Sequence, residues 1–143
     1  MRTFFQKNLK SSDFFYIIFV LLVVINFSVS VYARDPEPHQ VILYEHGNYK
    51  GSYIVLSYDR DVNNISYWHT DSGKSWNDKI SSIKVGKNTK VTLYEHKLSY
   101  KNGGAHITIQ GNCKQNKNKS SLSSIGWNDR VTALKVRMAD CYD

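Results

Sequence analysis

The sequence predicts an all-β domain, a two-sheet β-sandwich of two tandem Greek-key motifs with about eight strands. Two observations support this prediction. After residue 34, apolar and polar residues alternate in short runs with the period of a β-strand, and apolar residues nowhere recur with helical spacing over three turns. The same part of the chain also contains two copies of one sequence pattern, and the copies are about 50 residues apart.

The composition agrees with a single globular domain. The chain has 143 residues, of which 41% are hydrophobic and 22% charged, and its formal net charge is +7. This length is too short for a barrel enzyme or for a dinucleotide-binding domain with a partner domain. The apolar fraction excludes wholesale disorder.

The first element is a leader. Residues 14–33 contain no charged residue, and the segment before them is basic. Val31 and Ala33 stand at the small-residue positions that a signal peptidase requires, so we predict a signal peptide at 1–33 that is cleaved after Ala33. An uncleaved signal anchor is the alternative, because about 18 apolar residues can span a bilayer. Either form sends residues 34–143 out of the cytoplasm, which predicts a secreted, extracellular domain.

The exported part divides into Greek key 1, about 40–87, and Greek key 2, about 90–138. Runs that alternate with period two predict strands at 41–44, 53–58, 83–85, 91–93, 106–109 and 134–136. Residues 112–124, with Lys114, Lys117 and Lys119, are interpreted as a solvated loop inserted between strands. An anionic partner such as a polysaccharide or a membrane surface is the functional alternative for this loop.

Two segments make the repeat. Leu-Tyr-Glu-His at 43–46 returns at 93–96, and WNDKISSIKV at 76–85 returns as WNDRVTALKV at 127–136. Because both segments keep the same order and nearly the same offset, we interpret the exported part as a tandem duplication of a unit of about 50 residues. The tryptophans that begin the two decapeptides, Trp76 and Trp127, are interpreted as core or hairpin-packing aromatics.

The motifs of the first unit match a known family. Tyr44, Tyr49 and Gly51 match the Y-x-x-x-x-aromatic-x-Gly hairpin signature of βγ-crystallin Greek keys. The hexapeptide NDKISS at 77–82 matches that family's calcium signature, N/D-N/D-x-x-S/T-S, in full. The chain therefore resembles the βγ-crystallin superfamily over essentially all of 40–138, and it looks closest to single-domain microbial members such as M-crystallin and spherulin.

The second unit departs from the family pattern in two places. Tyr100 and Gly103 stand one and two residues later than the hairpin signature requires, so this hairpin is expected to differ in shape. The hexapeptide NDRVTA at 128–133 has Ala133 where the family usually has Ser. In the family this sixth residue is mainly structural and the fifth supplies a hydroxyl ligand, so a second calcium site is still predicted.

Each hexapeptide offers the oxygen ligands that calcium prefers, which are carboxylates, amides, hydroxyls and backbone carbonyls. The side chains concerned are an amide, a carboxylate and a hydroxyl in each unit: Asn77, Asp78 and Ser81, then Asn128, Asp129 and Thr132. The resemblance implies further ligands, namely the carbonyls of Lys79 and Arg130 and a carbonyl near Glu45 or Glu95 in the partner unit's first hairpin. We expect one or two calcium ions, with a dissociation constant of roughly 10⁻⁶ to 10⁻³ M. For an isolated copy of the hexapeptide, a turn with side-chain-to-backbone hydrogen bonds would be the alternative.

Cys113 and Cys141 are the only cysteines, and both lie in the exported part. An oxidising environment makes a disulfide between them the expected state, which would tie a loop to the C-terminus. Asn64 and Asn118 begin glycosylation sequons, which matter only in a eukaryotic source.

The function expected from the sequence is that of a secreted calcium-binding structural or stress module. The alternative is a calcium-dependent extracellular interaction protein, either a cell adhesion factor or an inhibitor or toxin on the same fold. No nucleophile-elbow, zinc-protease or phosphate-loop motif occurs, so the chain is not expected to be an enzyme. The partners considered are calcium, a second copy in a homodimer, and an extracellular protein or polysaccharide. Export disfavours nucleic acid, and a membrane is involved only if the leader is uncleaved.

Overall fold

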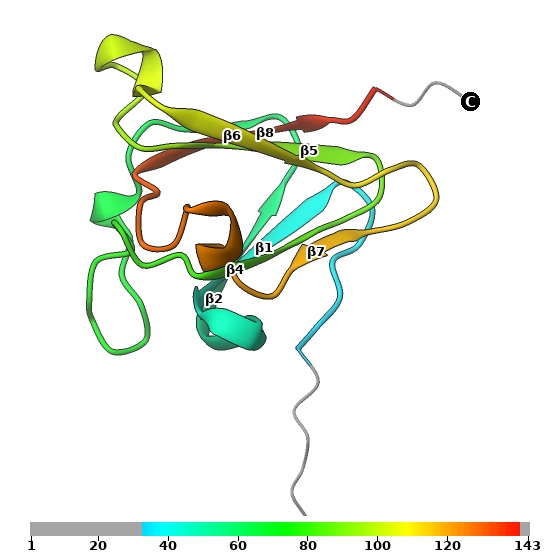
Figure 1. The fold of residues 1–143 in the computed structure, drawn as a ribbon, viewed down its shortest axis with the longest axis horizontal. Coiled ribbons are helices and arrows are strands. Elements are labelled where there is room, and N and C mark those ends of the chain that lie inside the picture. Colours follow the sequence, from blue (N-terminus) through cyan, green and yellow to red (C-terminus); the bar gives the residue numbers. More distant parts are fainter. Residues whose placement is uncertain (1–32, 141–143) are drawn as a thin grey trace, which may run out of the picture. The chain divides into compact units, whose positions relative to one another are not determined.

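The computed structural model describes residues 33–140. They form two four-stranded antiparallel sheets packed face to face, so the predicted all-β sandwich with eight strands is confirmed (Figure 1). The predicted leader, apart from Ala33, and Cys141 lie outside the described residues. Cleavage of the leader and the disulfide of Cys113 with Cys141 therefore stay predictions. Within residues 33–140, no helix is long and apolar enough to cross a membrane.

The two repeats exchange one strand each. The first sheet has the strand order β2-β1-β4-β7, and the second has the order β3-β8-β5-β6. The strands are β1 (Gln40–His46), β2 (Lys50–Ser57), β3 (Arg60–Val62), β4 (Ser82–Val85), β5 (Thr89–Tyr94), β6 (His106–Gln110), β7 (Lys117–Lys119) and β8 (Ala133–Met138). The connections contain 3₁₀ turns η1 (Gly47–Tyr49), η2 (Ile65–Tyr67), η3 (Lys101–Gly103) and η4 (Ser123–Ile125). Since β3 and β7 each join the sheet of the other repeat, the two Greek keys form one sandwich.

The exchanged strands are short edge strands that hydrophobic alternation does not predict. β3 reads Arg-Asp-Val and β7 reads Lys-Asn-Lys. The interpretation of 112–124 as a loop is therefore wrong for residues 117–119, which pair with β4 from Val85↔Lys117 to Ile83↔Lys119. Charged side chains on an edge strand discourage pairing with another chain, which accounts for the composition of both strands.

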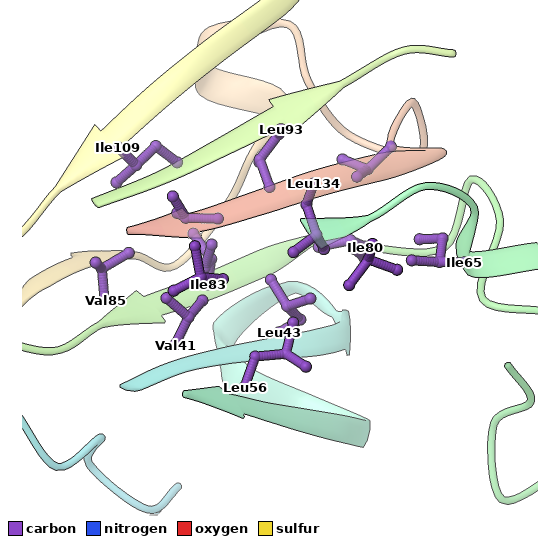
Figure 2. Packing of buried hydrophobic residues seen from close by; sticks show 14 of the residues in the cluster. Val41, Leu43, Leu56, Ile65, Ile80, Ile83, Val85, Leu93, Ile109 and Leu134 are labelled. Carbon is purple, nitrogen blue, oxygen red and sulfur yellow. The ribbon is translucent and has the colours of Figure 1, made fainter. Parts of the chain in front are cut away.

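The core lies between the sheets and combines inward positions of the four central strands with residues of the outer strands and the connections, such as Leu56, Ile65 and Ile109 (Figure 2). Each central strand contributes two fully buried residues: Val41 and Leu43, Ile83 and Val85, Val91 and Leu93, and Leu134 and Val136. These are the positions that the alternation predicts, and each such side chain stabilises the fold by about 1.5–3 kcal/mol. Trp76 and Trp127 are buried as well, which confirms them as core aromatics.

Residues 33–36, called the N-terminal strap below, are bonded to the outward-facing side chains of the first sheet. The ammonium of Lys84 on β4 contacts a carboxylate oxygen of Asp35 at 2.7 Å. The hydroxyl of Tyr44 on β1 donates to the carbonyl of Arg34 at 3.1 Å. The strap therefore covers part of a sheet face that would otherwise meet solvent.

The β5–β6 hairpin is longer than the β1–β2 hairpin. Tyr44 pairs with Tyr53 with eight residues between them, whereas Tyr94 pairs with His106 with eleven residues between them. The second hairpin therefore has three extra residues, and its shape differs from that of the first.

Gly51 and Gly104 occupy equivalent positions in the two hairpins. Gly51 has a φ of 77° and Gly104 a φ of 69°, a region that glycine adopts without steric cost. A Cβ would come within 2.8 Å of the His46 imidazole at Gly51, and within 2.6 Å of the His96 imidazole at Gly104. Gly104, and not Gly103 as the sequence comparison suggests, therefore takes the place of the signature glycine.

The tyrosines of the two hairpins pack differently. The Tyr49 ring lies edge-on to Tyr44 with the ring centres 5.6 Å apart. The Tyr100 ring lies edge-on to His96, also at 5.6 Å, and Tyr100 stays 54% exposed. In packing, Tyr100 is therefore no counterpart of Tyr49.

Candidate metal centre

The two signature hexapeptides form turns that precede β4 and β8 and are bonded to each other. The N–H of Asp78 donates to the carbonyl of Val131 at 3.2 Å, and the N–H of Asp129 donates to the carbonyl of Ile80 at 3.3 Å. Both aspartates have positive φ, 55° and 52°, a conformation that Asp tolerates better than β-branched or bulky residues do. The second residue of each motif is thereby bonded to the fourth residue of the other motif.

An amide and a carboxylate meet in each turn. Nδ2 of Asn77 donates to Oδ2 of Asp78 at 2.6 Å, and Nδ2 of Asn128 donates to Oδ2 of Asp129 at 2.6 Å. Rotation of either amide by half a turn presents its oxygen at the same point. Each turn can therefore direct two side-chain oxygens at one cation.

The hydroxyl predicted for the first site lies beside the carboxylate of the second motif. Oγ of Ser81 donates to Oδ1 of Asp129 at 3.2 Å. The N–H of Ser81 donates to the carbonyl of Tyr44 at 3.0 Å, and the N–H of Thr132 donates to that of Tyr94 at 2.9 Å, so strand ends hold both hydroxyl residues. The sequence places the three ligand types of a site within one repeat, whereas the structure combines Ser81 with the carboxylate of the other repeat.

The carboxylates of the centre repel one another. The pKa of Asp78 is raised above its ordinary value of 3.8, first because burial desolvates the carboxylate and then because Asp129 and Glu95 repel its negative charge. Lys79 and His96 oppose this shift with smaller effects. A cation bound here would relieve an existing conflict between negative charges.

The two hairpin glutamates have different partners. Oε1 of Glu95 accepts from Nη2 of Arg130 at 2.9 Å, and this hydrogen bond lowers the pKa of Glu95 below its ordinary value of 4.5. The Arg130 guanidinium also lies 5.2 Å from the centre of the Trp127 ring. Glu45 instead accepts from the N–H of Ser52 at 3.3 Å. Among residues 33–140, an ion pair therefore joins the second hairpin to its own motif, and none joins the first hairpin to its motif.

The chemistry of the centre requires oxygen ligands of several kinds. Within residues 33–140, no three His, Cys, Asp or Glu side chains form a group that could hold a metal ion. An ion here would therefore need the amides and hydroxyls, together with backbone carbonyls. The predicted carbonyl ligands, at Lys79, Arg130 and near Glu45 or Glu95, remain predictions.

The two sequon asparagines lie in different environments. Asn64 begins η2, where its Oδ1 accepts from the N–H of Ser66 at 2.9 Å, and it is only 8% exposed. Asn118 is exposed on the edge strand β7. In the folded domain the side-chain amide of Asn118 is therefore accessible, and that of Asn64 is not.

A cavity of about 460 Å³ opens beside the two turns. Asn77 and Thr132 of the two motifs contribute to its wall, together with Asn64, His96 and Tyr100. Sequence reasoning misses this cavity. The greater length of the second hairpin is the one sequence feature that points to this cavity. The cavity itself becomes visible only when the hairpin is packed in the folded domain.

The chain is similar to known proteins over most of the described domain. Residues 37–135 match the family model described as Beta/Gamma crystallin. A βγ-crystallin domain from Flavobacterium johnsoniae is 25% identical with a TM-score of 0.54, and the match covers 71% of this chain and 98% of that one. Spherulin 3a from Physarum polycephalum is 23% identical with a TM-score of 0.53, covering 76% of this chain and 92% of that one.

A structure from work on the evolution of the eye-lens βγ-crystallin domain fold is 23% identical with a TM-score of 0.59. That match covers 75% of this chain and 93% of the other. No curated protein matches the chain. The resemblance inferred from the hairpin and hexapeptide motifs is thereby confirmed, including its microbial single-domain members and spherulin.

Proposed function

The chain belongs to the βγ-crystallin family, and we propose that it is a secreted structural module that binds calcium and is stabilised by it. The observation that supports this best is the mutual bonding of the two signature turns, which gathers Asp78, Asp129 and Ser81 in one centre. An assembly of carboxylate, amide and hydroxyl oxygens suits a hard cation. Nitrogen and sulfur ligands, which zinc and copper favour, are absent from the proposed ligand set.

Each proposed ion takes its side-chain ligands from both motifs. One ion would take the Asp129 carboxylate, the Asn128 amide oxygen and the Ser81 hydroxyl, since the side chains of Asn128 and Ser81 are each hydrogen-bonded to the Asp129 carboxylate. A second ion would take the corresponding groups Asp78, Asn77 and Thr132. The carbonyls implied by the family resemblance and water would complete each set. We therefore propose one or two ions.

Calcium would stabilise the fold in two ways. It would neutralise the repulsion by Asp129 and Glu95 that, after desolvation by burial, raises the pKa of Asp78. It would also bind the native turns and not the unfolded chain, and at ten times the dissociation constant this linkage is worth about 1.4 kcal/mol per site. Because each turn is bonded to the other repeat, an ion at either turn would strengthen the association of the two Greek keys.

The extracellular location remains part of the proposal. The uncharged segment 14–33 behind a basic start supports export, and the two cysteines of the exported part support an oxidising compartment. A fold whose most distinctive features are a packed core and two paired turns supports a structural role rather than an enzymatic one.

A calcium-dependent interaction protein is the second candidate. The observation that favours it is the set of half-exposed or more exposed tyrosines, which are Tyr53, Tyr58, Tyr67 and Tyr100. Tyrosine is enriched at protein interfaces, because it combines an apolar ring with a polar tip. Calcium-dependent dimerisation or capture of one partner would favour this candidate.

The test is a calorimetric titration of residues 34–143 with calcium, alongside thermal melting in calcium and in chelator. We expect heat of binding, a higher melting temperature in calcium, and loss of one site each in Asp78→Ala and Asp129→Ala. Asp71→Ala is the matched control, because Asp71 is an exposed aspartate outside both hexapeptides. Absence of heat and of a melting shift at millimolar calcium would contradict the proposal.

A further inference from the structure

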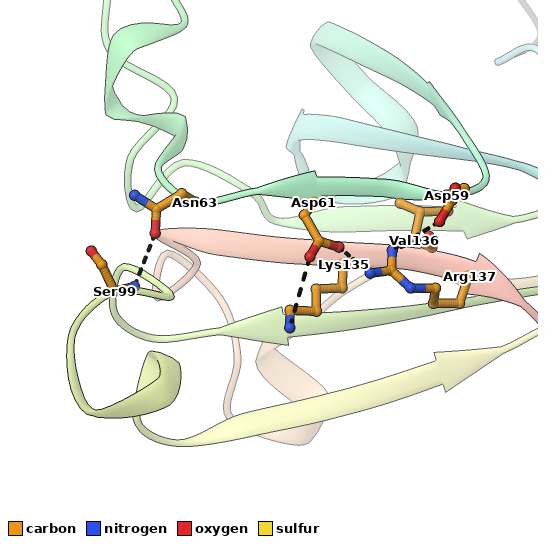
Figure 3. Close-up of polar contacts among 7 residues, drawn as sticks. All are labelled: Asp59, Asp61, Asn63, Ser99, Lys135, Val136 and Arg137. Carbon is orange, nitrogen blue, oxygen red and sulfur yellow. Dashed lines mark hydrogen bonds and ion pairs between the residues drawn. The ribbon is translucent and has the colours of Figure 1, made fainter.

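The cavity beside the metal centre is bordered by the longer second hairpin. Its extra residues hold on to the other repeat: the N–H of Leu98 donates to the carbonyl of Asn63 at 3.3 Å, and the N–H of Ser99 donates to Oδ1 of Asn63 at 2.9 Å (Figure 3). The loop thereby spans from β5 to the segment before η2. The cavity of about 460 Å³ lies where Lys97 and Tyr100 of this loop face η2 and the two turns.

The aromatic side chain of the first hairpin packs differently. The Tyr49 ring packs against Tyr44, and the Lys84 ammonium lies 4.9 Å from its centre. The N–H of Asn48 also donates to the carbonyl of Ser120 at 2.7 Å, which draws the short hairpin onto the other repeat. The two hairpins therefore make different contacts with the rest of the domain.

The wall of the cavity offers donors and no carboxylate. It contains the Lys97 ammonium, the His96 imidazole, the hydroxyls of Ser66 and Thr132, and two side-chain amides. Within residues 33–140, Lys97 forms none of the ion pairs. The unpaired ammonium of Lys97 attracts a ligand that carries negative charge, and it lies apart from the Asp78 carboxylate that is bonded to Asn77 behind the wall.

The Tyr100 ring adds an apolar surface to the polar wall. It is held edge-on by His96 and is 54% exposed. A ring fixed beside hydroxyl, amide and ammonium groups can pack against the C–H face of a sugar while the polar groups bond its hydroxyls. A bare inorganic anion would use the ammonium but would leave this ring without a role.

We propose that this cavity binds one hexuronic acid residue, with its carboxylate facing Lys97 and its ring packed against Tyr100. The volume lies in the range of about 300–1,000 Å³ that is usual for small-molecule sites. The hydroxyls of the sugar meet Ser66 and Thr132. The ligand is thus an acidic sugar, either free or within an acidic polysaccharide.

This inference does not rest on the proposed calcium function. Asn77 and Thr132 belong to both the cavity wall and the predicted ligand sets, so calcium can adjust the affinity for the sugar. Lys97 and Tyr100 belong to the cavity alone. Binding of the sugar in chelator is therefore expected, and a calcium titration of the same samples tests the other proposal separately.

The experiment titrates the full chain, recovered in whichever processed form its leader yields, with galacturonate, glucuronate, glucose and inorganic phosphate. Binding is followed by calorimetry and by the NMR shifts of His96 and Tyr100, and a galacturonate oligomer distinguishes a chain from a free sugar. We expect either hexuronate to bind at least about tenfold more tightly than glucose and than phosphate. Equal binding of glucose, equal binding of phosphate, or no shift of either ring would overturn the proposal.

Two variants test the assignment of roles. Lys97→Met keeps the length of the side chain and should weaken hexuronate about tenfold while leaving glucose unchanged. Tyr100→Ala should weaken both sugars. Lys114→Met is the control, because Lys114 is an exposed lysine outside the cavity. If Lys114→Met weakened hexuronate as much as Lys97→Met does, general attraction to a basic surface would replace the site.

Discussion

Lys84 and Lys135 occupy the same position in the two copies of the repeated decapeptide, yet their side chains are 8% and 38% exposed. Lys84 is covered by the N-terminal strap and contacts Asp35 at 2.7 Å. Lys135 lies on the outer face of the second sheet, 3.8 Å from Asp61 of the exchanged strand β3 (Figure 3). The same residue is therefore part of a covered contact in one sheet and of a solvated surface in the other.

The neighbouring outward positions show the same difference. Ile42 on β1 is fully buried, whereas its counterpart Thr92 on β5 bonds the Thr108 hydroxyl across the strands at 2.9 Å. The inward positions of both strands are equally buried. Duplication thus preserves the core, while segments outside the repeat decide what happens on the outer faces.

The largest expected effect tests the equality of the two core halves. Leu43→Ala and Leu93→Ala each remove a fully buried side chain from equivalent strands, so each should lower the free energy of unfolding by about 2–5 kcal/mol. Urea unfolding of both variants measures the loss. A difference of more than about 2 kcal/mol between them would show that the two halves do not share one core equally.

The next effect separates the outer faces. Asp35→Ala leaves the buried ammonium of Lys84 without its carboxylate and should cost about 2–3 kcal/mol. Asp61→Ala removes a partner from two partly exposed cations, Lys135 and Arg137, and should cost less than about 1 kcal/mol. Equal losses in urea unfolding would mean that the N-terminal strap adds nothing to the burial of Lys84.

The parts of the fold that the sequence predicts are those that alternation and duplication encode. The inward residues of β1, β4, β5 and β8 follow the period of two, and they are buried as predicted. The exchanged strands β3 and β7 escape prediction because three polar residues at a sheet edge need only backbone pairing. Their position is set by the sandwich around them and not by their own sequence.

The candidate centre is predictable in its residues but not in its pairing. Asn77, Asp78 and Ser81 are recognisable from the hexapeptide, yet the contact of Ser81 with Asp129 depends on how the two turns bond to each other. The cavity depends on three extra hairpin residues and on their bonds to Asn63. Contacts between repeats carry no local sequence pattern, so only the folded domain reveals them.

A third prediction compares glycines that share a backbone conformation but not their surroundings. Gly73 has a φ of 76° and open space where a Cβ would stand, so Gly73→Ala should cost about 1 kcal/mol from the conformation alone. Gly51→Ala and Gly104→Ala add a clash with His46 or His96 and should cost about 2 kcal/mol. Thermal melting of the three variants measures this order. A loss at Gly104 no greater than at Gly73 would show that the imidazole of His96 moves aside freely.

The smallest effect concerns two carboxylates of the centre whose pKa values shift in opposite directions. The raised pKa of Asp78 means that its charged form is disfavoured in the folded chain. Its unfavourable contribution is fully present above the folded pKa, and it disappears as the pH falls through that value towards the ordinary 3.8. In chelator, Asp78→Asn should therefore raise the stability at neutral pH, by less than about 1 kcal/mol because solvent screens the charge.

Glu95 should show the opposite sign. Its pKa is lowered by Arg130, so its favourable contribution is present above the ordinary value of 4.5 and is lost as the pH falls through the folded pKa. Glu95→Gln should accordingly lower the melting temperature at neutral pH in chelator, and the difference from wild type should vanish in acid. Melting curves of wild type and both variants across this pH range measure the two signs. If both variants shifted the melting temperature in the same direction at neutral pH, the charge conflict would not reside at Asp78, and calcium would have no repulsion to relieve there.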